Sequence, residues 1–226
     1  MASHTSLPYA PDAVLDLLEL VGGCNLEGVE AADAAAVAKD AAYVGREEAA
    51  RWAGRPLEGE LVRMGVELRR LGDVPGGERA SVRVAALTTY DSRPAGMRRV
   101  DLYVGEIARK HGALLGLGVE MSLDDLVELH LAHEFYHVLE FSSGRRTERL
   151  VPPMRVRGLL GVRSRPARRS SEVAAHAFAR AWLGHGPHPV LIDALSLVAS
   201  GSLAAGELRK RAAWALDLLD TYLACD

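Results

Sequence analysis

The sequence contains a His-x-x-x-His pair with a glutamate between them, His133-Glu134-Phe135-Tyr136-His137, inside a segment with helical spacing of apolar residues. Residues four apart lie on one face of an α-helix, one turn apart, so both imidazoles can bind one metal ion. Zinc accepts imidazole nitrogens in tetrahedral sites, which makes His133 and His137 candidate ligands. Glu134 lies about 100° round the helix from His133. There its carboxylate can take a proton from a zinc-bound water and pass it to a leaving amine, which predicts peptide-bond hydrolysis.

This motif has an alternative explanation, a buried helix that carries two histidines without a function. A random chain of this composition would contain the motif roughly 2% of the time, with positions taken as independent. Buried imidazoles also require hydrogen-bond partners, and two of them beside a glutamate on an apolar helix would be costly without a reason. We therefore favour a metal site.

Zinc requires a third protein ligand, and three residues compete for that place. Glu172 lies 35 residues beyond His137 and opens a second Ala-rich helical segment, which could pack closely against the first. Glu140 lies three residues past His137 on nearly the same face, about one turn too far along the helix to reach the same ion easily. His176 could replace Glu172 but is better placed to orient a ligand. We favour Glu172 and expect Glu140 and His176 beside the site.

Other polar residues could assist the same chemistry. His130 lies one turn before His133 and is an alternative ligand, although a place at the helix surface or beside a ligand is favoured. Asn, Tyr and His donors can polarise a substrate carbonyl or stabilise its oxyanion. Tyr103, His185 and His188 are candidates for that role, against the alternative that they are ordinary surface residues.

The elements that must position these residues are mostly helical. Apolar spacing and Gly or Pro punctuation predict helices at 11–21, 29–52, 58–64, 171–183, 189–199 and 203–223. Alternating patterns predict a small sheet of three strands at 66–71, 81–89 and 100–104. The helical pattern resumes at Ser122, where Ser122 and Asp125 form a capping box, and ends at Gly144. The helix with the metal motif is apolar on much of its circumference and is expected to be buried, and the class is α+β.

Residues 145–169 differ in kind from the rest of the chain. They contain nine arginines, one acid and three prolines, and they predict a long loop or irregular excursion. A solvated, partly disordered loop is one interpretation. A docking surface for an acidic protein, or a mobile lid over the cleft, is the other. Nucleic acid is not expected as a partner, because no aromatic residue is interleaved with these arginines.

Composition sets the outer limits. The 226 residues, 49% of them hydrophobic, fit a single folded domain with an N-terminal helical segment (1–56), a core (57–185) and C-terminal helices (186–226). The net charge of −3 gives no global reason to expect nucleic acid. Cys24 and Cys225 lack CxxC partners and suit a reducing compartment, although a bridge between them stays open. No signal peptide or membrane span is recognisable, so we expect a cytoplasmic protein with no membrane partner.

The segments 131–139 and 171–179 resemble the ImmA/IrrE-type zinc metallopeptidases. That family has a helical Leu-Ala-His-Glu-x-x-His segment, a downstream helix that contains a glutamate, and a small sheet before the metal helix. The resemblance covers about residues 60–185. It implies a zincin-like fold, zinc on His133, His137 and Glu172, and Glu134 as the base. Characterised relatives cut bacterial transcriptional repressors, so a regulatory protein substrate is implied. This chain differs in having His176 where the family often has Asn, in its long Arg-rich insert, and in showing no helix-turn-helix at its N-terminus.

Two functions of different classes follow. The first is a zinc-dependent peptidase of narrow specificity. The second is a non-hydrolytic interaction or regulatory module of zincin fold, with a structural or vestigial metal site. A hydrolase of a small amide is a weaker third hypothesis. Glu134 favours the enzymes, because a purely structural zinc site does not need that carboxylate and usually fills its fourth position with a protein ligand.

Overall fold

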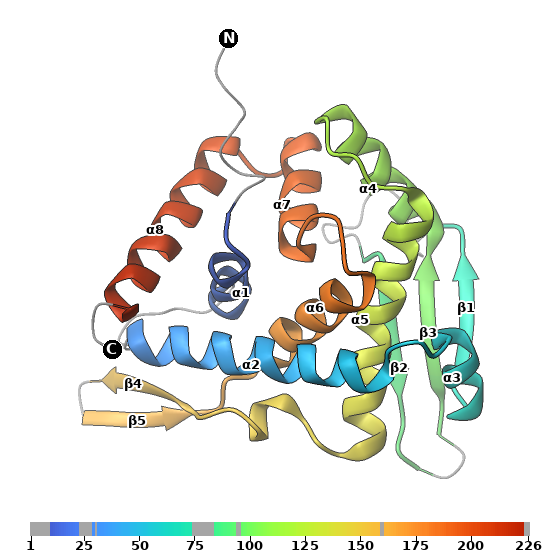
Figure 1. The fold of residues 1–226 in the computed structure, drawn as a ribbon, viewed down its shortest axis with the longest axis horizontal. Coiled ribbons are helices and arrows are strands. Elements are labelled where there is room, and N and C mark those ends of the chain that lie inside the picture. Colours follow the sequence, from blue (N-terminus) through green and yellow to red (C-terminus); the bar gives the residue numbers. More distant parts are fainter. Residues whose placement is uncertain are drawn as a thin grey trace.

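Figure 1 shows a computed structural model of the chain, which describes residues 10–22, 29, 31–73, 84–93, 96–158 and 161–223. The helices are α1 (Asp12–Val21), α2 (Ala31–Trp52), α3 (Leu57–Arg63), α4 (Val104–Gly116), α5 (Leu123–Ser143), α6 (Ser170–Leu183), α7 (Pro189–Ala199) and α8 (Ala205–Leu223), with a 3₁₀ turn, η2 (Thr147–Arg149). The strands are β1 (Glu67–Leu71), β2 (Ala86–Tyr90), β3 (Arg98–Tyr103), β4 (Met154–Gly158) and β5 (Gly161–Arg165). The class is therefore α+β and mostly helical, as predicted.

The three-stranded sheet has the order β1-β3-β2. β3 is parallel to β1, with Leu68 opposite Val100, and antiparallel to β2, with Thr88 opposite Val100. Val100 is fully buried, because β3 is the central strand and packs against α5. The edge strand β2 also contacts α5, where the Thr88 hydroxyl donates to the carbonyl oxygen of Glu134 at 3.2 Å. The sheet thus fixes one side of the helix with the metal motif.

Both ends of helix α5 have capping residues. The Ser122 hydroxyl accepts a hydrogen bond from the backbone N–H of Asp125 at 3.0 Å, which confirms the expected N-cap. Gly144 ends the helix with φ +68°, a left-handed conformation that glycine adopts without strain. Between these ends α5 lies between the sheet and α6 (Figure 1). Phe135 is fully buried, so the helix is central to the fold, as predicted.

Helix α6 belongs to both of the apolar clusters that form the core. Its residues Ala174, Ala175, Phe178 and Ala179 pack in a cluster with α5, the sheet and α7. Its residues Val173 and Ala177 pack in a second cluster with α1, α2 and the segment around Met154. Small side chains let α2 come close: a Cβ on Gly45 would lie 2.1 Å from the carbonyl oxygen of Ala174. α6 is therefore held from two sides.

The observed helices agree with the predicted ones to within a few residues, with one exception. Helix α4 was not predicted, because Gly105 and Gly112 interrupt its pattern and few of its side chains are buried. Gly105 is required by a close approach of two backbones. Its N–H donates to the carbonyl oxygen of Gly72 at 2.7 Å, and a Cβ there would lie 2.4 Å from that oxygen. The helix therefore begins directly after β3, without a loop.

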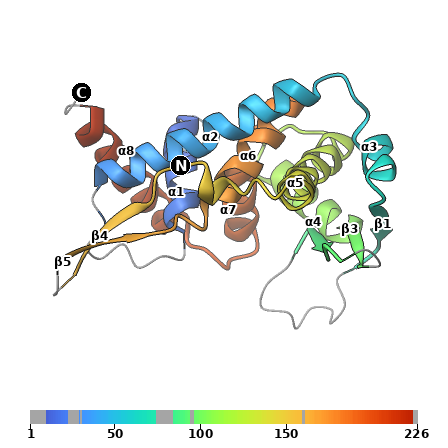
Figure 2. The same ribbon diagram turned by 90° about the horizontal axis from the view of Figure 1, so that it is seen from below.

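The Arg-rich segment 145–169 is also different from the prediction of a loop or irregular excursion. It contains η2 and an antiparallel hairpin of β4 and β5. The hairpin is anchored because Met154 is buried in the second cluster and the Arg155 guanidinium binds Asp33 of α2 at 2.7 Å. Figure 2 shows the hairpin beside α2 and α8, at the opposite end of the molecule from the three-stranded sheet. Arg163 and Arg165 on β5 are exposed.

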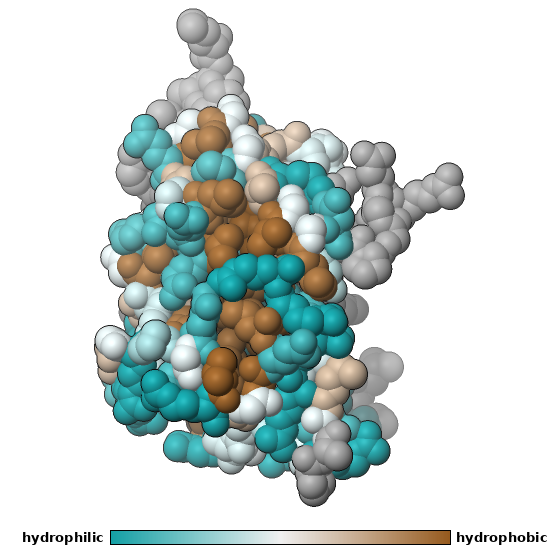
Figure 3. Space-filling view, turned by 90° about the vertical axis from the view of Figure 1, so that its right-hand side faces the viewer, coloured by the Kyte–Doolittle hydropathy of each residue, from teal (hydrophilic) through white to brown (hydrophobic). Residues whose placement is uncertain are grey.

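Several sequence features lie outside the described residues. These are the first part of the strand expected at 81–89, Cys24 and Cys225. In the described part of the chain, no helix has the length and apolarity that crossing a membrane would require. Figure 3 shows the side of the molecule with α3, β1 and α4, where apolar side chains form a strip bordered by polar ones. Val62 of α3 and Leu115 of α4 are among the exposed apolar side chains.

Candidate metal centre

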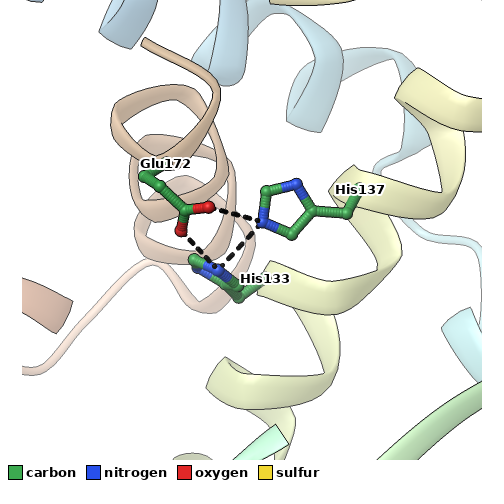
Figure 4. Close-up of side chains that lie close together, drawn as sticks. All are labelled: His133, His137 and Glu172. Atoms are coloured by element: carbon green, nitrogen blue, oxygen red, sulfur yellow. Dashed lines mark hydrogen bonds and ion pairs between the residues drawn. The ribbon is translucent and has the colours of Figure 1, made fainter. Parts of the chain in front are cut away.

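Three side chains converge between α5 and α6 (Figure 4). The Nε2 atoms of His133 and His137 are 3.2 Å apart. Glu172 directs one carboxylate oxygen to each ring, 3.4 Å from Nε2 of His133 and 3.6 Å from Nε2 of His137. The structure thus brings together the two motif histidines and the favoured third residue, and these three can hold a metal ion.

The spacing of the two imidazole donors is near that of a tetrahedral ion. Ligand atoms about 2.0–2.2 Å from such an ion lie about 3.3–3.6 Å from one another. The two Nε2 atoms are 3.2 Å apart, close to that value, and each has a different oxygen of Glu172 near it, at 3.4 and 3.6 Å. The donor set of two imidazoles and one carboxylate is one that zinc accepts, and three protein ligands are typical of catalytic zinc. The residues present therefore fit zinc.

The other nitrogen of His137 lies in a network of polar side chains around Glu140. Nδ1 of His137 is 3.4 Å from a Glu140 oxygen, and the Ser171 hydroxyl donates to that same oxygen. The other Glu140 oxygen accepts from the N–H and the hydroxyl of Thr147, at 2.7 and 2.6 Å. The Thr147 hydroxyl is also 2.6 Å from the Tyr136 hydroxyl. Glu140 thus lies beside the site, as predicted, and is placed to orient His137.

The charged side chains of the site shift one another's pKa. Burial alone would lower the pKa of His137, but hydrogen bonds with Glu140 and Glu172 raise it to about 10. Burial raises the pKa of Glu172, but the two histidines outweigh burial and lower it. Burial also raises the pKa of Glu140, but contacts with His137, Ser171 and Thr147 outweigh burial and lower it. Both carboxylates therefore stay ionised, and they attract a cation between the rings.

The site opens into a pocket of about 280 Å³. Glu134 lines this pocket together with His133 and Glu172, and only 7% of Glu134 is exposed. Its position on α5 is fixed by the Thr88 hydrogen bond to its backbone. The glutamate between the histidines is therefore beside the metal ligands and in the space where a substrate would lie.

Two charged pairs on other elements line the same pocket, and sequence reasoning missed them. The guanidinium of Arg169, just before α6, binds the Glu19 carboxylate of α1, and its Nε donates to the Glu19 carbonyl oxygen at 2.7 Å. The Lys110 ammonium of α4 binds the Asp193 carboxylate of α7. Burial, with help from nearby Glu172, raises the pKa of Glu19, although Arg169 opposes this. These four residues lie far from the motif in sequence, so spacing could not reveal them.

Of the other candidate polar residues, two line the pocket and two do not. His130 and His176 line the pocket, and the His176 and His133 rings are 4.7 Å apart between centroids. Tyr103, at the end of β3, is buried and is not a pocket residue. His185 is 63% exposed and lies near Asp125.

His188 has a structural role at the start of α7. Its Nδ1 accepts from the N–H of Val190 at 3.2 Å, so it caps α7. Its Nε2 therefore carries the proton and donates to buried Asp16 at 3.2 Å. Both ring nitrogens of His188 are engaged away from the pocket.

Comparison of the chain with models of protein families, with curated proteins and with solved structures finds no significant match.

Proposed function

We propose that this chain is a zinc-dependent peptidase. The observation that carries the proposal is the convergence of His133, His137 and Glu172 within metal-binding distance of one another, with Glu134 in the adjoining pocket. A zinc ion held by these residues would act as a Lewis acid that polarises the scissile carbonyl and makes water more acidic. Glu134 accepts the proton of the attacking water and delivers it to the leaving amine. Each cycle consumes one water and breaks one C–N bond, and it releases a carboxylate and an amine.

The other residues of the site support these roles. Glu140 lies 3.4 Å from Nδ1 of His137 and can hold a proton on that nitrogen, so a bound zinc ion would take the place of the proton on Nε2, which faces Glu172. The contact of β2 with the backbone of Glu134 keeps that turn of α5 in place. Hydrogen-bonded supports of this kind hold a catalytic group within the narrow range of positions that reaction requires.

The resemblance to ImmA/IrrE-type metallopeptidases adds a finer proposal. It supports a zincin-like fold and a regulatory protein, such as a transcriptional regulator, as the substrate. A pocket lined by several fixed charged pairs is consistent with narrow specificity, because an ill-matched substrate would bury a charge without a partner.

Metal analysis of the purified protein is the first test. We expect one zinc per chain, lost in His133→Ala and in Glu172→Ala because each removes one of three ligands. Absence of zinc after reconstitution in the parent protein would refute the metallopeptidase proposal.

The second test concerns Glu134. Glu134→Gln should keep zinc and the fold but lose hydrolysis by about 100-fold or more, since an amide cannot accept the proton. Activity is measured as new peptide termini, by mass spectrometry, in a proteome-derived peptide library. Activity that depends on zinc but is unchanged in Glu134→Gln would refute the role of the glutamate. A zinc-loaded parent protein without peptidase activity on its physiological partners would favour the alternative, a non-hydrolytic module with a structural metal.

A further inference from the structure

The outer strand of the hairpin, β5, carries arginines without acidic partners. Residues 161–169 contain four arginines and no acid. One of the four, Arg169, binds Glu19. Arg163 and Arg165 of β5 are exposed, and among the described residues neither forms an ion pair. Two neighbouring positive charges repel each other, so this strand favours a ligand that brings negative charge.

β5 is also the free edge of its sheet (Figure 2). The sheet has two strands, and the residue Val156 of the other strand, β4, is bridged to Val29. In the described part of the chain no strand pairs with the outer side of β5. Alternate backbone N–H and C=O groups along such an edge are unpaired and can bind one more strand. β5 can therefore hold an extended peptide through its backbone.

The register of the hairpin determines the face on which the two arginines lie. Arg163 is opposite Val156, and Arg165 is opposite Met154. Directly opposite residues of an antiparallel pair have their side chains on the same face of the sheet, so the two arginines share the face of Met154. They are two positions apart on one strand, a spacing of about 7 Å. Alternate residues of an added strand have the same spacing, so two acids at such positions would each lie opposite an arginine.

The hairpin is fixed to the rest of the protein before any partner binds. Met154 is buried in the second core cluster, and the Arg155 guanidinium binds Asp33 of α2. A binding edge that is already ordered loses little conformational freedom when a peptide is added. The edge is thus prepared for strand addition.

An acidic peptide fits this surface better than a nucleic acid does. Residues 154–165 contain no aromatic side chain on which bases could stack. A two-stranded ribbon that enters the major groove must present an open face, whereas the face of Arg163 and Arg165 also carries Met154, which is buried in the core. A peptide strand, in contrast, can use the unpaired backbone groups of β5 and the two arginines together.

We propose that β5 is a docking site for an extended acidic segment of a partner protein, which adds to the hairpin as a third strand and places acids at alternate positions opposite Arg163 and Arg165. Main-chain hydrogen bonds supply affinity in this mode of binding, and the arginines select acidic side chains. The pocket beside the candidate metal centre contains no residue of β5. The docking site therefore stands independently of the proposed peptidase function.

The test is fluorescence anisotropy of labelled peptides, about eight residues long, with the full chain at about 50 mM salt. Glutamate and threonine alternate in the first peptide, and glutamine replaces glutamate in the second. The third has the composition of the first, with its glutamates in one block. We expect the first peptide to bind, and the other two to bind about tenfold or more weakly.

Each comparison can overturn part of this reasoning. A glutamine peptide that binds as tightly as the first would refute selection by charge. A block peptide that binds as tightly would refute strand addition, because only the alternating peptide presents acids on one face of a strand. Failure of the first peptide to bind, or tighter binding of a DNA duplex or single strand of similar length, would overturn the docking site altogether.

A double variant assigns the binding to β5. Arg163→Gln combined with Arg165→Gln should weaken the first peptide about tenfold or more, because both charged partners are removed. Arg70→Gln is the matched control, since Arg70 is 48% exposed on β1, an edge strand of the other sheet, and it should bind the peptide like the parent. If the double variant keeps its thermal unfolding and the parent affinity, the assignment to β5 is wrong. The comparison of peptides on the parent protein decides the proposal even where the variant does not fold.

Discussion

Gly45 of α2 leaves no room for a side chain against the backbone of Ala174 in α6, so Gly45→Ala tests whether that contact positions the metal ligand on α6. The added Cβ would lie 2.1 Å from the Ala174 carbonyl oxygen and 2.9 Å from its carbonyl carbon. Both atoms are backbone, so no side chain can rotate away. Ordinary contact needs more than 3 Å, and the two helices must separate by about 1 Å.

The expected loss of stability follows from two opposing effects. Overpacking of a buried contact costs about 1–3 kcal/mol and occasionally more. A change from glycine to alanine in a helix interior otherwise stabilises by about 1 kcal/mol. We therefore expect Gly45→Ala to lower the free energy of unfolding by up to about 2 kcal/mol and the melting temperature by up to about 8 °C. Because α6 carries Glu172, the same displacement should weaken zinc binding by about tenfold or more.

The assay is thermal unfolding of the zinc-loaded and zinc-free proteins, with zinc affinity from chelator competition. Gly112→Ala is the matched control, since Gly112 is inside α4 and a Cβ there has nothing within 4 Å. That control should raise the melting temperature by about 2–4 °C and leave zinc affinity unchanged. If Gly45→Ala is as stable as Gly112→Ala and binds zinc normally, α2 does not position α6 in the way described.

Two other substitutions test single carboxylates. Glu140→Gln places an amide where a carboxylate accepts from its neighbours, and zinc affinity in chelator competition should fall about 10–100-fold; unchanged affinity would mean that Glu140 does not orient His137. Asp16→Asn removes a buried carboxylate next to His188. Burial raises the pKa of Asp16 above its ordinary 3.8, despite the hydrogen bond with His188. The folded protein thus holds this proton more tightly than the unfolded chain does, and the stability it contributes is lost as pH rises through the folded-state pKa. Thermal melts of Asp16→Asn should therefore gain more relative to the parent at pH 8 than near pH 4, close to the ordinary pKa, and a gain that is the same at both would contradict this.

Local signals were sufficient for most of the fold. Helix α5 has a side-chain cap at Ser122 and a left-handed glycine at its end, and both signals can be read without knowing any tertiary contact. The hairpin of β4 and β5 could not be read in that way. Four of its ten strand residues are arginine, β5 is exposed, and the contact of Arg155 with Asp33 depends on a helix 122 residues earlier in the chain. Helix α4 was hidden because Gly105 and Gly112 interrupt its pattern, and a backbone contact explains only the first of them.

Some residues of the candidate site could likewise be predicted from local spacing, and others depend on tertiary packing. His133 and His137 are one turn apart on one helix, so spacing alone places them together. Glu172 could be proposed because an Ala-rich helix can approach another closely, and the structure brings it to the two histidines. The pairing of Arg169 with Glu19 was not predictable, because it joins residues 150 positions apart whose proximity depends on the packing of α1 against α6.

The membership of α6 in both core clusters has a consequence for cooperativity. Neither cluster can lose its packing without removing support from α6, so the described core should unfold in one transition. The metal ligands come from α5 and α6 and meet only when both clusters are intact. Zinc that binds only the folded state therefore stabilises both core clusters and not only the metal site. Removing the ion should lower a single melting transition, with secondary structure and tertiary packing lost together.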